Sequence, residues 1–530
     1  MLFTSLDFII LVTVVAILYY TVGKNYQTYV LLFGSYCFYY IALPEGLLFV
    51  WVTTLSAYLV AIHMSKIQDQ LDVYLAGEGV ELSKKEKKLC RQTSKKRKKK
   101  AMLIAVLLSL GILAVTKYTN FAIANVNVIL EKFTNISALT FVDLIVPLGI
   151  SFYTFMTVSY VLDVYHNRYA AEKNLAKVAL YVSFFPQMIQ GPISRFNDVS
   201  KTMFERHDFD KKNVCFALQR ILWGYFKKLV IADRVYVGVC AIVQNPDEFT
   251  GAFVFVGMIL YTIQMYADFT GGIDITIGVA ELFGIKLKEN FRRPYFSKSL
   301  KEYWTRWHIT MGSWFADYVF YPVSISPKIL ELSRYSRKKF GNEIGKRVPL
   351  YVAVLAVWLT TGIWHGASWY FVVWGLLNGT IILISNELEP LYAKFHSKFH
   401  VEGKLYYKIF RVLRTLLLIS ALRMLDYYRN ITLSFQMFGS LFTDWNLSAL
   451  FNGGLLSLGL SVGDFIIIAL SVLLLLVVSL KQRAGSVREY ISHLSYPRKV
   501  TIWYGLCLII LVFGMYGIGF ESSQFIYNQF

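Results

Sequence analysis

The chain has 530 residues, of which 56% are hydrophobic and 16% aromatic, with a mean hydropathy of +0.48. Its formal net charge is +20, concentrated in a few segments. This composition excludes a soluble domain, because apolar runs of nearly spanning length recur along the whole chain. The sequence therefore predicts an all-α polytopic membrane protein of about ten to twelve spans, in a single domain over residues 1–530.

The expected spans follow from the apolar runs. Several of these runs are shorter than the ~20 residues that a straight span needs, so some must be tilted, extended by polar flanks, or re-entrant. In chain order they are Phe8–Val22, Tyr29–Leu43, Leu47–Ile62, Met102–Val115, Leu144–Val161, Phe253–Met265, Pro349–Ile363, Tyr370–Ile384, Leu413–Leu422, Phe465–Leu480 and Ile502–Ile518. The first run has no basic n-region before it and no small-residue cleavage site after it, so we expect a retained span.

The basic segments predict the topology. The densest block, Ser83–Lys100, lies in a basic loop over residues 65–100 after three apolar runs, and such loops stay in the cytoplasm. Lys328–Arg347 and Lys481–Lys499 are expected on the same side. Both termini, including a tail over residues 521–530, are then extracytoplasmic. Next to membrane spans, anionic lipid explains the basic charge more simply than nucleic acid does.

Cysteine and histidine spacing gives no sign of a metal centre. The cysteines are scattered without paired spacing, which indicates neither a disulfide framework nor a metal site. No HExxH pattern occurs among the histidines, so we expect no metal. The five cysteines are Cys37, Cys90, Cys215, Cys240 and Cys507.

Two polar interruptions precede the middle of the chain. Pro186–Pro192 has a proline at each end and a glycine within, so it predicts a re-entrant element near a tunnel. Within Gln264–Glu281, the pair Gly271-Gly272 predicts a helix break between two acidic residues. These carboxylates need partners, and Arg292-Arg293 are the candidates. An architectural ion pair is favoured over catalysis.

Lys298–Phe320 predicts one amphipathic interfacial helix. Its large apolar residues recur at steps of three and four, and His308 borders that face. One interpretation makes His308 a headgroup-level residue, and another makes it functional. The apolar-face residues are Trp304, Trp307, Met311, Trp314, Phe315 and Tyr318.

His365 lies in the segment Thr360–Trp369, between two nearly continuous apolar runs. An ionisable side chain at bilayer depth is costly and faces protein or a water-filled cavity, so it is a functional candidate by default. From position alone, a structural histidine bonded between helices is an equally good interpretation.

An ordered set of motifs resembles the membrane-bound O-acyltransferase (MBOAT) family, in the branch of the alginate O-acetylation protein AlgI. Each motif is weak alone, but the order is specific, and the similarity is clearest from about residue 150 to the end. The motifs are Pro147–Phe155 (PLGISFYTF), Gln190–Ile193 (QGPI), Tyr266–Gly272 (YADFTGG), Phe291–Tyr295 (FRRPY), Trp304–Thr310 (WTRWHIT), Gly362–Gly366 (GIWHG) and the terminal Phe525–Phe530 (FIYNQF).

The resemblance implies a ring of helices around a tunnel, in the cytoplasmic (inner) membrane of a bacterium. It implies that His365 is the catalytic residue and His308 the second family histidine. The co-substrate would be an acyl thioester such as acetyl-CoA, with no cofactor bound, and the product an O-acetylated extracellular or cell-wall polysaccharide. Arg292, Arg293, Lys301 and Arg306 are candidates to hold donor phosphates, although interfacial basic residues also serve as anchors.

The same resemblance implies a partner. An extracytoplasmic SGNH-hydrolase-like acetyltransferase would place the acyl group on the polysaccharide, and Tyr527 in the terminal motif would relay it. An aromatic anchor is the alternative for Tyr527. Two other functions stay open: D-alanyl transfer to teichoic acid (DltB-like) or lipid acylation, and a non-enzymatic polysaccharide transporter, for which we see no repeat.

Overall fold

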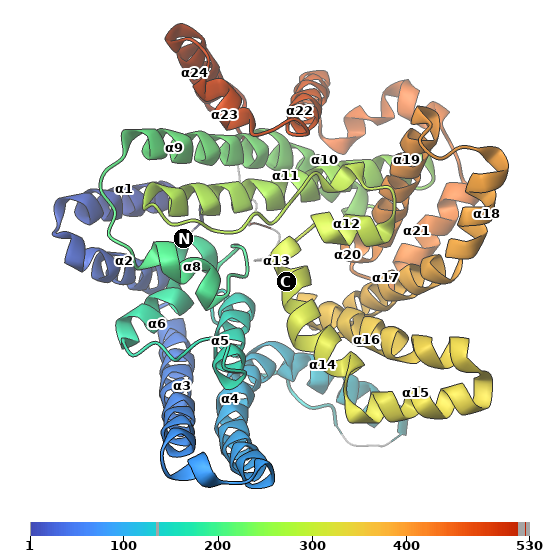
Figure 1. Ribbon diagram of the computed structural model, residues 1–530. Helices are drawn as coiled ribbons and strands as arrows, with labels where there is room; N and C mark the ends of the chain where they lie inside the picture. Colours follow the sequence, from blue (N-terminus) through green and yellow to red (C-terminus); the bar gives the residue numbers. More distant parts are fainter. Residues whose placement is uncertain (1, 134–136, 518–524, 526–530) are drawn as a thin grey trace. The chain divides into compact units, whose positions relative to one another are not determined.

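The structure is a computed structural model that describes residues 2–133, 137–517 and 525. Its described residues are predominantly helical, with no strand among them, which confirms the predicted all-α class (Figure 1). They form two compact units: residues 1–218 with 276–288, and residues 219–275 with 289–530. Two helices contribute to both units, namely α9 (Lys211–Tyr225) and α11 (Ala252–Leu282).

The first unit contains α1 to α8. These helices are α1 (Leu6–Thr21), α2 (Gln27–Ala42), α3 (Leu47–Ala76), α4 (Lys84–Phe133), α5 (Ile150–Tyr165), α6 (Leu175–Ser183), α7 (Phe185–Met188) and α8 (Phe196–Met203). In Figure 1, α3 and α4 run side by side. Most of the predicted basic loop over residues 65–100 belongs to these two helices, because lysine and glutamate favour helix.

The second unit contains α10 and the helices from α12 onward. They are α10 (Asp233–Gln244), α12 (Leu300–Arg306), α13 (Ile309–Phe315), α14 (Tyr321–Ser324), α15 (Pro327–Phe340), α16 (Asn342–His365), α17 (Trp369–Glu387), α18 (Glu389–Phe399), α19 (Leu405–Leu422), α20 (Met424–Tyr428), α21 (Ile431–Thr443), α22 (Val462–Lys481), α23 (Val487–Ser492) and α24 (Tyr496–Phe513). The segments η4 (Phe226–Ala232) and η6 (Ala316–Phe320) are π-helical.

Seven helices of the described chain are long and apolar enough to cross a membrane. They are α3, α4, α11, α16, α17, α22 and α24, and α1 is apolar but shorter. The chain is thus a multi-pass membrane protein. The other predicted runs lie in helices that are too short or too polar to span by length and composition alone.

The interruption at Pro186–Pro192 is buried inside the first unit. Short α7 is followed by irregular backbone whose residues 189–194 are buried, which fits the rule that non-helical backbone at membrane depth lies within protein. Gly149, at the start of α5, has φ +68° and packs on this segment. A Cβ at Gly149 would lie 2.2 Å from the Met188 carbonyl oxygen, so only glycine fits there.

The predicted helix break at Gly271-Gly272 is wrong, because α11 runs unbroken through both glycines. The role of Gly271 is close packing against α9. A Cβ at Gly224 would lie 2.7 Å from the Gly271 carbonyl oxygen, and a Cβ at Gly271 would lie 3.0 Å from the Gly224 carbonyl oxygen. The glycines therefore bring the two backbones together, as small residues do between membrane helices.

This close approach supplies the partners of two acidic residues in α11, Asp268 and Asp274. Asp274 binds Lys227 at 2.5 Å and Arg220 at 2.9 Å, so the predicted pairing with Arg292-Arg293 is wrong. Asp268 binds Lys228 at 2.7 Å. Both lysines lie in η4, which directly follows α9 in the chain. Spacing in the sequence does not indicate that η4 packs beside α11. Asp268 and Asp274 therefore form ion pairs, which is the type of role that the sequence predicted.

Candidate functional site

Glycines set the spacing of the α16–α17 hairpin that carries His365. A Cβ at Gly362 would lie 2.5 Å from the Phe371 carbonyl oxygen, and one at Gly375 would lie 2.4 Å from the Trp358 carbonyl oxygen. The helices therefore touch through backbone, as in other small-residue membrane interfaces. His365 is the last residue of α16, just before the turn into α17.

The His365 imidazole is half-buried in an aromatic cluster. Its ring centroid lies 4.8 Å from that of Trp374 and 5.1 Å from that of Trp364. Nδ1 lies 2.8 Å from the Thr361 carbonyl oxygen, one helical turn earlier. Because a carbonyl only accepts, Nδ1 must carry the proton, which makes Nε2 the basic nitrogen of the neutral ring.

His308 occupies a break in what the sequence predicted as one helix. Lys298–Phe320 instead forms α12, α13 and η6, with His308 between the first two in the left-handed region at φ +47°. A non-glycine residue there is strained and persists only when its surroundings fix it. The side chain is fully buried, so the headgroup-level interpretation of His308 is wrong.

Asn290 holds this break in place through a single oxygen. Its Oδ1 accepts hydrogen bonds from the Thr310 backbone N–H at 3.0 Å and the Thr310 hydroxyl at 2.9 Å. The same oxygen lies 3.2 Å from His308 Nδ1. The backbone donor identifies the Asn290 atom as oxygen, so His308 Nδ1 donates and its Nε2 is the basic nitrogen.

Electrostatics link the two histidines. Burial lowers the pKa of His308 well below 6.5, and protonation of His365 would lower it further. His308 is therefore neutral at physiological pH. The Trp364 ring neighbours both histidines, with its centroid 6.2 Å from that of His308 and 5.1 Å from that of His365. The structure thus brings together the two histidines that the sequence singled out.

The segment before His308 is attached to the hairpin and to a buried cation. Trp304 Nε1 donates to Asn378 Oδ1 at 3.1 Å, which ties α12 to α17. Arg423 lies 4.6 Å from the centre of the Trp307 ring and donates to the Tyr303 hydroxyl at 2.8 Å. A cation desolvated over an aromatic face is stabilised there.

The four predicted donor-binding cations do not form one cluster around the histidines. Arg292 and Arg293 line a cavity of about 730 Å³ whose other walls include α22 and α24. Arg306 pairs with Glu302 at 2.6 Å, and Lys301 is exposed. Neither of these last two lines that cavity. The assignment of all four to donor phosphates stays a prediction.

Tyr527 lies outside the described residues, and its relay role stays a prediction. Phe525 is described and buried, with Lys228 Nζ 4.5 Å from its ring centre. The Phe525 ring therefore lies beside a buried cation. Within the described part of the chain, no group of three or more histidine, cysteine or acidic residues is placed to hold a metal ion.

Sequence reasoning missed Asn290 and Arg423. Asn290 stands just before the FRRPY motif, and nothing in the local pattern distinguishes it from a surface residue. Arg423 follows an apolar run, where a membrane anchor is the usual interpretation of a basic residue. Both act through contacts with residues that are distant in sequence, so spacing carries no signal for them.

Comparison with known proteins identifies the family of this chain. The family model described as MBOAT, membrane-bound O-acyltransferase family, matches residues 171–333 and 340–426, which include both histidines. A probable alginate O-acetylase AlgI of Pseudomonas syringae pv. tomato is 29% identical over 85% of this chain and 76% of its own length. A probable alginate O-acetylase AlgI of Azotobacter vinelandii is 31% identical over 67% of this chain and 66% of its own length.

Relatives of lower identity are named for other activities. A peptidoglycan O-acetyltransferase of Helicobacter pylori is 28% identical over 56% of this chain and 57% of its own length. A teichoic acid D-alanyltransferase of Bacillus subtilis is 26% identical over 48% of this chain and 62% of its own length. All of these activities are acyl transfers, so the transporter alternative is set aside. The chain belongs to the membrane-bound O-acyltransferase family and is an acyltransferase of the membrane, similar to the AlgI proteins.

Proposed function

We propose that this enzyme moves an acetyl group from a cytoplasmic thioester, acetyl-CoA, across the membrane for O-acetylation of an extracellular or cell-wall polysaccharide. One observation carries the proposal: two neighbouring imidazoles, each with Nδ1 donating, have basic Nε2 atoms within one aromatic cluster. A neutral imidazole of this kind is suited to accept a proton from a hydroxyl group.

The proposed step uses His365 as the base. Its Nε2 takes the proton of the acceptor hydroxyl as the oxygen attacks the thioester carbonyl. The carbon–sulfur bond then breaks, and the proton passes to the departing thiolate, leaving an ester and a thiol. Nucleophilic catalysis, with the acyl group carried on the imidazole, is the alternative course. His308, held neutral, would orient the reactants rather than supply a proton.

The route and the partner belong to the same proposal. We place the protein in the bacterial cytoplasmic membrane with both termini outside, the basic segments inside, and a tunnel joining the two sides. An extracytoplasmic SGNH-hydrolase-like acetyltransferase would complete transfer to the polysaccharide. Tyr527 would carry the acyl group between the two proteins, with a base removing its proton, since a phenol has an ordinary pKa of about 10.

Radiolabelled acetyl-CoA, purified protein and candidate partner proteins test this function directly. We expect label in the polysaccharide only when both proteins are present. Efficient labelling by the purified chain alone would contradict the division of labour. Tyr527→Phe keeps the aromatic ring and removes the hydroxyl, so normal acetylation by that variant would exclude the relay.

D-alanyl transfer is the second candidate function, supported by the similarity to teichoic acid D-alanyltransferases. The two candidates differ in donor. D-alanine bound to a carrier protein, supplied in place of acetyl-CoA in the same assay, decides between them. Transfer of D-alanine without transfer of acetate would overturn the acetyl proposal.

A further inference from the structure

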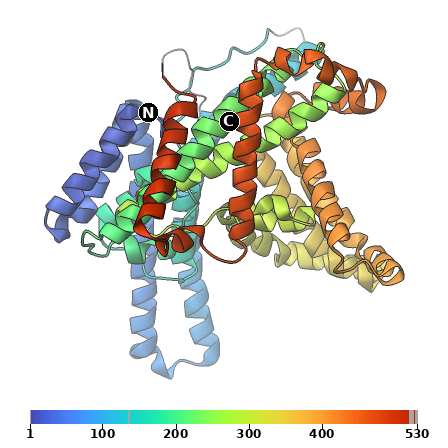
Figure 2. The same ribbon diagram turned by 90° about the horizontal axis from the view of Figure 1, so that it is seen from above.

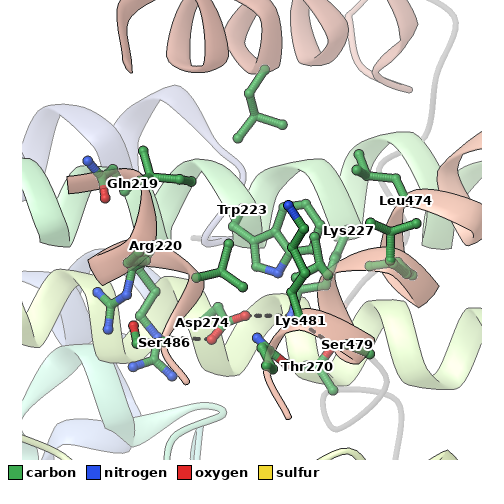
Figure 3. A pocket seen from close by; sticks show the side chains of 18 of the residues that line it. Gln219, Arg220, Trp223, Lys227, Thr270, Asp274, Leu474, Ser479, Lys481 and Ser486 are labelled. Atoms are coloured by element: carbon green, nitrogen blue, oxygen red, sulfur yellow. Dashed lines mark hydrogen bonds and ion pairs between the residues drawn. The ribbon is translucent and has the colours of Figure 1, made fainter. Parts of the chain in front are cut away.

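A cavity between the C-terminal helices and the rest of the second unit is built from two chemically different parts. It has a volume of about 730 Å³, within the range of about 300–1,000 Å³ that is typical of small-molecule sites. Lys481, Ser479 and Ser486 line the cavity together with Asp274 and its partners (Figure 3). In Figure 2, α22 and α24 are two separate helices joined through α23.

Two membrane helices supply the apolar part. Leu475 and Val478 of α22 line the cavity, together with Ile502, Leu506 and Ile509 of α24. Only 17% of the α22 span and 6% of the α24 span are buried within the protein. The bilayer therefore surrounds these helices, and a hydrocarbon chain reaches the cavity without passing through water.

Cations dominate the polar part. Six of the lining side chains are cationic, namely Arg220, Lys227, Arg292, Arg293, Lys481 and Arg488, against two carboxylates. The carboxylates, Asp274 and Glu289, are already engaged by Arg220 and Lys227. The lining therefore carries a net positive charge that the ion pairs do not cancel, and such a surface favours an anion.

Arg293 is the best-defined member of this cationic part. It has φ +51°, and its guanidinium lies 4.6 Å from the centre of the Phe296 ring. Burial and then the positive charges of Arg306 and Arg483 lower the pKa of Arg293, so its electrostatic environment is positive. Like charges held together in this way repel one another unless a counterion lies between them.

We infer that this cavity is a binding site for an anionic phospholipid, with its phosphate at Arg293 and Lys481 and an acyl chain along α22 and α24. Basic pockets between membrane helices bind such headgroups. The apolar part decides against acetyl-CoA at this site, because an acetyl group has no hydrocarbon chain to fill it. The inference reassigns Arg292 and Arg293 from donor to lipid.

Lipid binding by purified protein, measured by native mass spectrometry, tests the cationic part. We expect dioleoylphosphatidylglycerol to bind at one molecule per chain and dioleoylphosphatidylcholine to bind far more weakly. Replacing two cations, in Arg293→Gln with Lys481→Gln, should weaken binding about 30-fold, from the usual contribution of each basic residue. The control is Lys96→Gln with Lys99→Gln, which removes two exposed lysines of α4. Equal weakening in both variants, or equal binding of both lipids, would overturn the site.

A second pair of variants tests the apolar part and does not depend on the arginines. Leu475→Trp places a larger side chain, an indole ring, in the cavity, whereas Leu473→Trp adds the same ring on the exposed side of α22. We expect only Leu475→Trp to displace phosphatidylglycerol. Acetyl-CoA is the competitor that separates the two ligands, since both carry phosphate. Displacement of the lipid by acetyl-CoA, or retention of lipid by Leu475→Trp, would refute the lipid assignment. These readouts measure binding and are independent of whether acetyl transfer is the reaction.

Discussion

Replacing Asn290 with leucine should disable His308 without enlarging or emptying the core. The two side chains are similar in size, and Asn290 Nδ2 has no hydrogen-bond partner among the described residues. What is lost is the Oδ1 acceptor. The Thr310 hydroxyl can rotate toward another acceptor, but the Thr310 N–H and His308 Nδ1–H are fixed donors.

The magnitude follows from those two donors. Each buried donor left unsatisfied costs about 1–3 kcal/mol, so Asn290→Leu should lower the free energy of unfolding by about 2–6 kcal/mol. The left-handed backbone at His308 also loses its restraint. Displacing a positioned group by about 1 Å costs about 100-fold in rate, so acyl transfer should fall by that factor.

Thermal unfolding in detergent and acyl transfer by folded protein measure the two effects separately. Asn290→Asp is the matched control, because it keeps an acceptor oxygen for Thr310 and His308. It also places a negative charge beside His308, which should raise the pKa of that imidazole and shift the pH dependence of the rate. Asn290→Leu protein with unchanged melting temperature and unchanged rate would refute the role of Asn290 as a positioning residue.

Three further predictions concern charge. His365→Ala should lower acyl transfer by about 10²–10⁴-fold while the protein stays folded, and a near-normal rate would remove His365 from the mechanism. Burial lowers the pKa of His308 in the folded protein below 6.5, so its contribution to the free energy of unfolding is present above pH 6.5 and decreases as the pH falls from 6.5 to the folded pKa. His308→Gln should make the free energy of unfolding less dependent on pH in this interval, and an unaltered slope contradicts the assignment. Asp274→Asn should destabilise the fold by about 3–5 kcal/mol, because Lys227 and Arg220 are both buried. Glu343→Gln, which breaks an exposed pair, is its control and should leave the melting temperature unchanged.

Much of the architecture was predictable from the sequence because it depends on local composition. Apolar runs predict helices in a membrane wherever they occur, since lipid offers no partner for an unpaired backbone group. The same cost made His365 a functional candidate before any fold was known. The family motifs favoured a functional His308, for which periodicity alone had also allowed a place at the membrane interface.

The tertiary structure decided what depends on contacts between distant segments. Gly271 looked like a helix break, but it is a contact with Gly224, because a missing side chain permits close packing as readily as it permits a turn. Asp274 pairs with Lys227 of η4 and Arg220 of α9. It does not pair with Arg292-Arg293, which are nearer in sequence. The burial and tautomer of His308 depend on Asn290, eighteen residues earlier in the chain. The role of Asn290 as a hydrogen-bond acceptor becomes visible only with its donors, His308 and Thr310, and these come together only in the folded chain.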